Sequence, residues 1–163
     1  MATLEARVQV LEDEKAILRT MLQYAHAEDQ VDPESFMDCF TEDGVWWSTV
    51  DGPWAGTGGS RHEGREELGR WHASSHAAGR ARPGPHGKGK HYLVGPDIRV
   101  DGDRATAESY HLSVTSSPDG PKMGTMGRYL DVFVRCPDGR WRMTHRQLVR
   151  EGASVEGMKR TTT

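Results

Sequence analysis

The sequence has few cysteines and no long apolar run. Cys39 and Cys136 are the only cysteines among 163 residues, and their spacing fits neither a disulfide framework nor a metal-binding motif. No apolar stretch approaches the ~20 residues that a membrane-spanning helix needs. The first residues lack the apolar segment of a secretory signal. We therefore expect a cytoplasmic protein that has no membrane partner.

The chain also lacks a large excess of either charge. The formal net charge is −3 and the sequence pI is about 6.2, so a general electrostatic grip on nucleic acid is not expected. A length of 163 residues fits one ordinary domain with its own core. We expect a single domain over residues 1–150 and a flexible tail over residues 151–163.

The first half of the chain has the pattern of helices. Apolar residues between positions 4 and 25 recur at steps of three, four and seven, which predicts a long amphipathic helix. Asp32 and Pro33 form a start signal for a second, short helix, and residues 66–78 predict a third. The first helix is expected to bury one row of apolar residues: Leu4, Val8, Leu11, Leu18, Leu22 and Ala25. Four charged residues on its other side are expected to face solvent: Glu5, Glu12, Asp13 and Arg19.

The second half has the pattern of strands and tight turns. Strands are expected over residues 45–50, 91–100, 104–115, 123–135 and 140–150, and Asp-Gly pairs in the turns favour hairpins. Residues 41–44 predict a turn, 51–60 a glycine-rich loop or hairpin, and 78–90 an exposed basic loop. Helices followed by an antiparallel meander predict an α+β domain. A curved sheet around the long helix would enclose a pocket.

Asp29 continues the inward row of the first helix by four residues. A carboxylate at such a position needs a hydrogen-bond partner or borders a cavity. If the helix instead ends by residue 27, Asp29 is a solvated loop acid, and the periodicity does not separate the two. His91 opens the second predicted strand. Paired with a buried carboxylate, it would keep one ring nitrogen free as a base near neutral pH, whereas alone it would be an ordinary surface or core histidine.

Several segments resemble the SnoaL-like, or nuclear-transport-factor-2-like, superfamily. They are residues 24–32 with 36–46, residues 91–105, and the two final strand segments 127–133 and 138–143. Together they cover nearly the whole chain from residue 4 to about 150. The resemblance implies a cone-shaped, strongly curved mixed or antiparallel sheet wrapped around a long N-terminal helix, with two shorter helices.

Within that superfamily the chain is most similar to the branch of scytalone dehydratase and bile-acid 7α-dehydratase. The branch implies a catalytic Asp29–His91 pair, a substrate bound inside the cone, no cofactor, and a homo-oligomer, with a trimer favoured over a dimer. Tyr24, five residues before Asp29, has the spacing of a catalytic Tyr and Asp in the bile-acid enzyme. Five helical residues turn about 140°, so both face one cavity only if the helix ends between them, and Tyr24 could equally be a core aromatic beside Met21.

The resemblance suggests further residues for substrate binding. His111 is similar to a second catalytic histidine, although a structural histidine is the stronger reading. Trp47 occupies the place of a water-binding Tyr, whose role an indole does not fill equally. Arg146 matches a pocket arginine, with a solvated strand residue nearly as good a reading. Four tryptophans could form apolar walls: Trp46, Trp47, Trp54 and Trp71.

Two other patterns in the sequence are weaker evidence for a binding site. His72 and His76 have the i, i+4 spacing of a metal clamp, but the residues between them offer no third ligand, so no metal site is expected. The glycine-rich segment 84–90 resembles a phosphate cradle but lacks the ending of one.

These features predict a cofactor-free acid–base enzyme, a dehydratase or an isomerase, acting on a hydrophobic cyclic substrate of polyketide, steroid or terpenoid type. His91 would be the base, Asp29 its orienting partner, and Tyr24 would bind an oxygen. Three alternatives stay open: a polyketide-type cyclase, the non-catalytic small (beta) subunit of a ring-hydroxylating dioxygenase, and a ligand-binding module.

Overall fold

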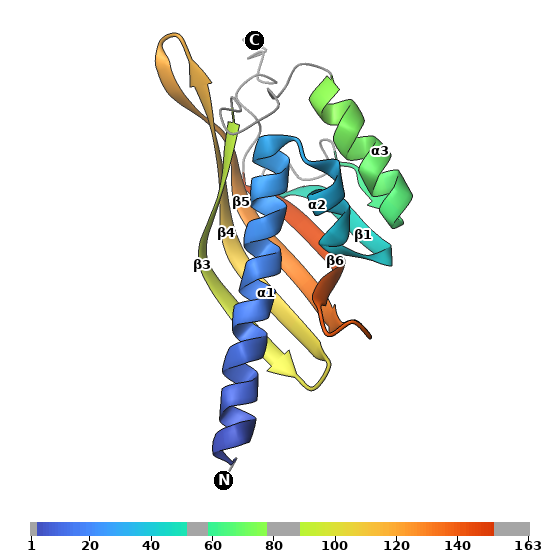
Figure 1. The fold of residues 1–163 in the computed structure, drawn as a ribbon. Helices are drawn as coiled ribbons and strands as arrows, with labels where there is room; N and C mark the ends of the chain where they lie inside the picture. The colour runs from blue at the N-terminus through green and yellow to red at the C-terminus, as the bar shows by residue number, and fades with distance from the viewer. Residues whose placement is uncertain (1–2, 52–58, 78–88, 152–163) are drawn as a thin grey trace.

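The computed structural model describes residues 3–51, 59–77 and 89–151. Two helices come first and a third follows the first two strands; all three lie on one face of a sheet (Figure 1), so the expected α+β class is confirmed. Trp54, most of the 78–90 loop and the tail from residue 152 lie outside the described residues. The elements are α1 (Leu4–Gln30), α2 (Pro33–Asp38), β1 (Phe40–Asp51), β2 (Arg61–Glu63), α3 (Arg65–Ser75), β3 (Gly89–Asp101), β4 (Arg104–Ser117), β5 (Gly120–Arg135) and β6 (Trp141–Glu151).

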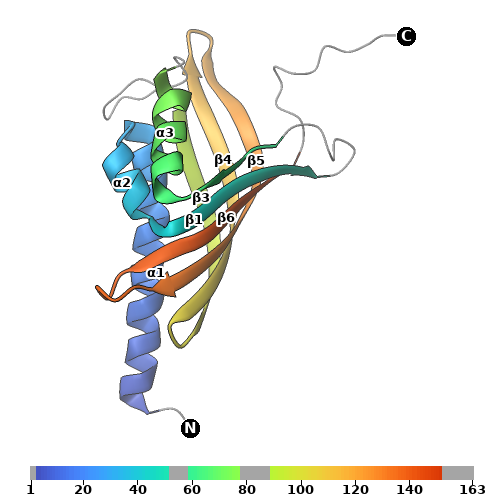
Figure 2. The same cartoon turned by 90° about the vertical axis from the view of Figure 1, so that its right-hand side faces the viewer.

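The six strands form one open, mixed sheet with the order β2-β1-β6-β5-β4-β3. β1 and β6 are parallel, and the other neighbours are antiparallel. The sheet is strongly curved, and its concave side faces α1 (Figure 2). The hairpins expected after residue 90 are present, with Gly102 and Gly139 at positive φ angles of 58° and 78° in their turns.

Helix α1 buries a different row of residues from the one expected. Leu4 and Leu11 are 68% and 63% exposed, whereas Ile17, Met21 and Tyr24 are buried against the sheet. The amino-terminal turns of α1 extend past the sheet (Figure 1), so the apolar residues there have no surface to cover. The expected stripe was therefore wrong at Val8 and Leu22 as well, and right only at Ala25, with Leu18 half-buried.

Asp13 was expected to face solvent, and this was also wrong. It is 4% exposed, accepts a hydrogen bond from the Trp141 indole at 3.1 Å and forms an ion pair with Arg135 at 2.6 Å. These contacts replace the water that a carboxylate loses on burial. They also attach the middle of α1 to the β5–β6 end of the sheet.

Helix α1 continues to Gln30, so Asp29 lies in its last turn. The helix ends at Val31, whose φ of 57° is left-handed and whose N–H bonds back to Ala27 and Glu28. Asp32 caps α2, as expected, by accepting a hydrogen bond from the Ser35 N–H at 3.1 Å.

β1 is longer than the expected strand. Residues 41–44 were expected to form a turn, but they belong to the strand, with an irregularity between Phe40 and Val45 where it pairs with β6. Gly44 is needed there because a Cβ atom would lie 2.9 Å from the Cβ of Phe40. The short strand β2, which had no clear pattern in the sequence, pairs with β1 at the sheet edge.

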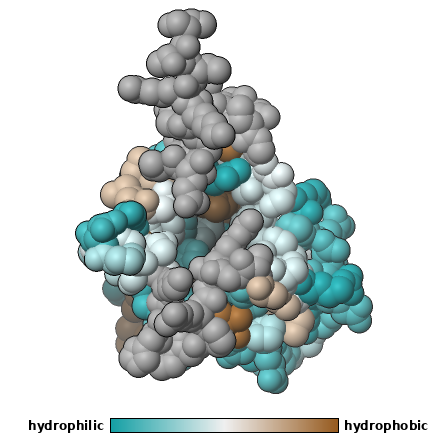
Figure 3. Space-filling view, turned by 90° about the horizontal axis from the view of Figure 1, so that it is seen from above, coloured by the Kyte–Doolittle hydropathy of each residue, from teal (hydrophilic) through white to brown (hydrophobic). Residues whose placement is uncertain are grey.

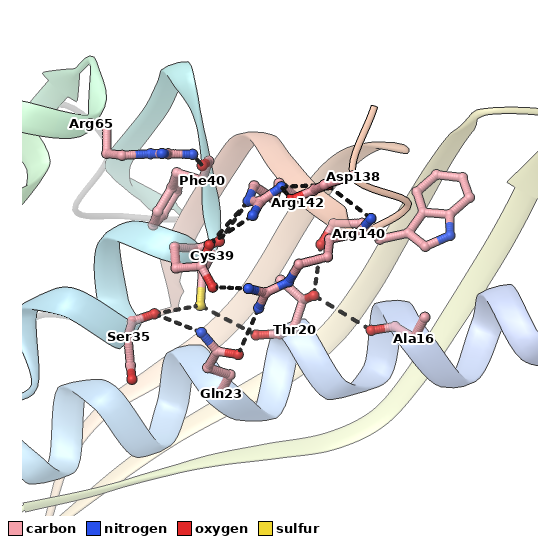
Figure 4. Close-up of polar contacts among 12 residues, drawn as sticks. Ala16, Thr20, Gln23, Ser35, Cys39, Phe40, Arg65, Asp138, Arg140 and Arg142 are labelled. Atoms are coloured by element: carbon pink, nitrogen blue, oxygen red, sulfur yellow. Dashed lines mark hydrogen bonds and ion pairs between the residues drawn. The ribbon is translucent and has the colours of Figure 1, made fainter. Parts of the chain in front are cut away.

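Polar contacts fasten α1 and α2 to β6 (Figure 4). The Thr20 hydroxyl donates to the carbonyl of Trp141 at 2.7 Å, and the Cys39 thiol donates to the Ser35 carbonyl at 3.2 Å. The Arg142 guanidinium pairs with Asp38 at 2.8 Å. They fix the position of α1, whose carboxyl-terminal end borders the site described below.

In the described part of the chain, no helix is both long and apolar enough to cross a membrane.

Candidate active site

A cavity of about 340 Å³ lies between the last turns of α1 and α3 and the adjoining ends of β3, β4 and β5. Figure 3 looks onto this end of the molecule, where the surface is hollowed and is bordered by both hydrophilic and hydrophobic residues. The cavity wall combines aromatic rings with several ionisable groups. Its described lining is Tyr24, Glu28, Asp29, Trp46, Trp71, Ser75, His76, Gly89, His91, His111, Ser113, Thr115, Thr125, Tyr129 and Leu148.

Asp29 and His91, 62 residues apart in the chain, meet in the cavity wall. Oδ1 of Asp29 accepts from the ring Nδ1–H of His91 at 2.8 Å and from its backbone N–H at 3.0 Å. A carboxylate acceptor assigns the proton to Nδ1 and leaves Nε2 with a free lone pair. The double contact holds the ring against rotation. Of the two positions that the sequence left open for Asp29, the structure shows the helical one, because α1 continues to Gln30.

His91 is partly exposed to the cavity, and its surroundings raise its pKa. Its side chain is 27% exposed, against 9% for Asp29. Burial alone would lower the pKa of His91, but the hydrogen bond that its ring donates to Asp29 and the negative charge of Glu28 outweigh burial and raise the pKa above its usual value. The ring is thus a stronger base than a free imidazole.

His111 lies in β4 beside His91, with ring centroids 5.6 Å apart and an angle of 25° between the planes. It is 2% exposed, and its Nδ1 has no hydrogen-bond partner among the described residues. Burial lowers the pKa of His111 to about 3, helped by the charges of His91 and Arg146. His111 is therefore neutral near pH 7. The sequence favoured a structural histidine, and the structure places its ring in the cavity wall.

The Tyr24 hydroxyl accepts a hydrogen bond from the Trp46 indole at 3.0 Å. Its ring packs against Tyr129, with centroids 5.9 Å apart, and both tyrosines border the cavity. Burial raises the pKa of both phenols, so both keep their protons at neutral pH. Tyr24 and Asp29 line one cavity although α1 continues through both, so the expectation that this requires the helix to end between them was wrong.

Arg146 does not border the cavity. It is fully buried and pairs with Asp131 through two hydrogen bonds of 2.8 and 2.6 Å. Its guanidinium lies 4.1 Å from the Tyr24 ring centroid and 4.2 Å from that of Tyr129. The reading as a solvated strand residue was wrong. Arg146 packs against the two tyrosine rings on the side away from the cavity. Its position therefore does not favour the direct contact with substrate that was expected of a pocket arginine.

The tryptophans divide between the two faces of the sheet. Trp46 and Trp71 border the cavity, with ring centroids 4.4 Å apart. Trp47 points the other way, toward His145 and Arg61 on the outer face. Trp47 therefore does not line this cavity, contrary to its expected place in the pocket, because neighbouring residues of a strand face opposite sides.

Three further ionisable groups converge beside the cavity: Glu28, His72 and His76. Nε2 of His76 lies 3.1 Å from Oε2 of Glu28, and Nε2 of His72 lies 4.0 Å from the same oxygen. Burial, which raises the pKa of Glu28, is outweighed by the hydrogen bond with His76, and the pKa is lowered. Burial lowers the pKa of His72. The i, i+4 spacing in the sequence indicated the two histidines but not Glu28. The only signal for Glu28 was its position one helical turn after Tyr24.

The SnoaL-like domain model matches residues 9–147. This protein belongs to the SnoaL-like domain family, which is the superfamily that the sequence segments resemble. No curated protein matches the sequence.

Solved structures share the fold over most of the chain. A substituted form of Rv3472 from Mycobacterium tuberculosis, a protein of unknown function, is 26% identical with a TM-score of 0.69, covering 93% of this chain and 76% of that one. An NTF2-like protein with a cystatin-like fold from Novosphingobium aromaticivorans is 23% identical with a TM-score of 0.69, covering 96% and 90%. ActVI-ORFA from Streptomyces coelicolor is 21% identical with a TM-score of 0.65, covering 84% and 96%. The last two likenesses show the fold alone.

Proposed function

We propose that the protein is an acid–base enzyme that removes an acidic C–H proton from a hydrophobic, cyclic substrate, most simply as a dehydratase. The observation that carries the proposal is the bond between Asp29 and the Nδ1–H of His91 in the wall of a cavity. That bond points the second ring nitrogen away from Asp29 as a free base. Such a base typically contributes about 10²–10⁴ in rate.

The aromatic wall supports an apolar substrate with few oxygens. Trp46, Trp71 and Tyr129 offer ring surface, while the Tyr24 and Tyr129 hydroxyls offer protons. Trp46 donates to the Tyr24 oxygen, and a side-chain hydrogen bond also joins Tyr24 to Tyr129, so one of the two phenolic protons remains to be donated. A carbonyl oxygen held there would gain negative charge as the adjacent C–H bond breaks, and the phenol would stabilise that charge.

The dehydration balances with these groups alone. Nε2 of His91 takes the proton α to the carbonyl, and the C–H electron pair forms the new double bond as the β C–O bond breaks. The leaving hydroxide takes the proton from the His91 imidazolium and departs as water. No cofactor is needed for this step. An isomerase would return the same proton to another carbon of the substrate instead.

The alternatives draw less support from the site. A polyketide-type cyclase would use the same base, so Asp29 and His91 do not separate it from a dehydratase. One solved structure with this fold, 17% identical with a TM-score of 0.71, is assigned as the beta subunit of an aromatic-ring-hydroxylating dioxygenase from Novosphingobium aromaticivorans; this likeness concerns the fold alone. Such a subunit has no use for a base in a cavity. Co-purification with a large iron-containing chain would favour it.

The test follows proton transfer directly, because the substrate is unknown. A panel of cyclic ketones bearing a β-hydroxyl is incubated with the protein in deuterated water. NMR then records deuterium at the α carbon, and mass spectrometry records loss of water. We expect His91→Ala and Asp29→Asn each to reduce the active reaction by a hundredfold or more while the circular dichroism spectrum is unchanged.

His145→Gln is the matched control, because His145 is an exposed histidine on the outer face of the sheet. It should react at the normal rate. Equal rates in wild type, His91→Ala and Asp29→Asn would remove the proposed base, and tight binding of the ketones with no exchange in any variant would favour a binding module.

A homo-oligomer and a cytoplasmic location stay predictions from the sequence. What supports self-association is a row of exposed apolar residues on the outer face of β3, β4 and β5: Tyr92, Val94, Tyr110, Met123 and Met126. Larger apolar patches on a protein surface commonly mark contact sites.

A further inference from the structure

The last turns of α1 and α3 bring two imidazoles and a carboxylate together. His72 and His76 come from α3 and its C-cap, and Glu28 comes from α1. One ligand atom from each side chain lies within 4.8 Å of the other two. The two distances to Oε2 of Glu28 are 3.1 Å from His76 and 4.0 Å from His72. The missing third ligand of the His72–His76 pair is therefore supplied by a residue more than forty positions away.

His72 is buried without the contacts that a buried imidazole normally makes. It is 1% exposed and stacks on Phe36 at 4.3 Å between ring centroids. Neither of its ring nitrogens forms a well-oriented hydrogen bond among the described residues, although the Ala27 backbone and Glu28 both act on its pKa, and Nδ1 of His76 has no partner there either. Buried polar atoms are normally satisfied, because an unpaired one costs about 1–3 kcal/mol. A bound group that accepts a nitrogen lone pair would satisfy His72.

The electrostatic surroundings favour a cation. Both helices end beside the cluster, and the carboxyl-terminal end of a helix carries a partial negative charge. The last turn of α1 has no basic residue to balance it. The Glu28 carboxylate is almost buried, with 12% of its side chain exposed. A positive ion between these groups would offset a charge that otherwise sits in a poorly solvated place.

We propose that Glu28, His72 and His76 form a binding site for a divalent transition-metal ion of the zinc type. Zinc binds imidazole and carboxylate ligands at about 2.0–2.2 Å, so two ligand atoms of a tetrahedral site lie roughly 3.3 Å apart. Small rotations of the side chains bring the observed separations to that value. The i, i+4 spacing on α3 holds the two rings on one side of the helix.

The fourth position of the metal opens toward the cavity, since Glu28 and His76 both border it. It would bind water or an oxygen of the substrate. The site shares no ligand with the proposed base, because it uses neither Asp29 nor His91, although the charge of Glu28 acts on the pKa of His91. A metal ion here would add an oxygen-binding point to the wall from which Asp29 also projects.

The experiment measures metal binding by the full chain, without an activity assay. The protein is stripped with a chelator, dialysed and titrated with Zn²⁺ by calorimetry, and Co²⁺ is added separately because its visible absorption reports tetrahedral coordination. We expect one Zn²⁺ per chain and a tetrahedral Co²⁺ spectrum. His76→Gln and Glu28→Gln should each weaken Zn²⁺ binding by a hundredfold or more.

His26→Gln is the matched control, because His26 is an exposed histidine of α1, and His91→Ala tests the neighbouring site. Both variants should bind Zn²⁺ as the wild type does. No binding to the folded wild type would overturn the proposal, as would equal weakening in His26→Gln or loss of binding in His91→Ala. If the wild type binds Zn²⁺ while His91→Ala and Asp29→Asn react at the wild-type rate, the metal site is retained and the proposed function is rejected.

Discussion

One carboxylate oxygen, Oδ1 of Asp29, accepts both the ring N–H and the backbone N–H of His91, at 2.8 and 3.0 Å. The backbone bond fixes where β3 begins relative to the end of α1, and the ring bond fixes the tautomer. A substitution of Asp29 therefore acts on position and on proton location together. This coupling explains how a side chain on a strand end is held still enough to serve as a base.

Tyr24→Phe is expected to reduce turnover roughly 100- to 1,000-fold, the size of effect given by one lost donor to a developing oxyanion. Phenylalanine keeps the ring contacts with Phe36 and Tyr129 and removes only the hydroxyl. The Trp46 indole then loses its acceptor, so the free energy of unfolding should fall by about 1–3 kcal/mol. Steady-state kinetics and urea denaturation measure the two effects. Tyr92→Phe on the outer face is the control, and an equal loss of turnover there would contradict the role of Tyr24.

Arg146→Met is expected to destabilise the fold by about 3–5 kcal/mol, because it leaves the buried Asp131 charge without its partner. The double variant Arg146→Met/Asp131→Leu should lose less than the single variant, since no unpaired charge remains. Urea denaturation measures both. Arg99→Met, which breaks an exposed pair with Asp97, should change stability by less than about 1 kcal/mol. A double variant as unstable as the single one would show that the charge is not the cause.

Stability is expected to fall as the pH is lowered from about 6.5 to about 4.5, the range between the ordinary pKa values of histidine and glutamate. His111 has a folded-state pKa of about 3, below its unfolded value, so the unfolded chain binds more protons in this range. His111 therefore contributes stability that is present above the unfolded pKa and is lost as the pH falls toward the folded one. The groups that act on its titration are His91, Arg146 and Glu28.

The His111→Phe variant should show a flatter dependence of unfolding free energy on pH over the same range, measured by urea denaturation at each pH. A residual slope is expected from His72, whose pKa burial also lowers. His145→Gln, an exposed histidine, should keep the wild-type slope. An unchanged slope in His111→Phe would contradict the neutral, buried state of this ring.

Val94→Glu is expected to dissociate the predicted homo-oligomer. Val94 pairs with Tyr110 across β3 and β4, and both side chains are more than half exposed on the outer face. A buried, unpaired carboxylate at a contact between two copies would be costly. Light scattering coupled to size exclusion measures the mass. Ala73→Glu places the same charge on the exposed side of α3 and should leave the mass unchanged. A monomeric wild type would reject the self-association itself.

The order of the helices and strands, apart from β2, could be read from the sequence because it depends on local signals. The Asp32–Pro33 start of α2 and the Asp-Gly turns at Gly102 and Gly139 act within a few residues. The resemblance to the SnoaL-like family drew attention to Asp29 and His91, and the structure brings them into contact. The catalytic role of this contact is the proposal that the proton-exchange experiment tests.

Other features had no local signal. Which side of α1 is buried depends on where the sheet ends, so the leucine row was misleading at Leu4 and Leu11, and Asp13 was placed on the wrong side. The burial of Arg146 depends on Asp131 and two tyrosines from other elements.

The amino-acid sequence by itself determined the class of fold, the order of the elements other than β2 and the hairpin turns after residue 90, because hydrophobic period, capping and turn chemistry are properties of short segments. Only the tertiary structure decided which side chains share a space. The meeting of Glu28 with His72 and His76 requires two helices to end at the same place, and long-range packing sets that position. The same packing decides which ionisable groups lose their water, and hence which of them are available to bind a proton or a metal ion.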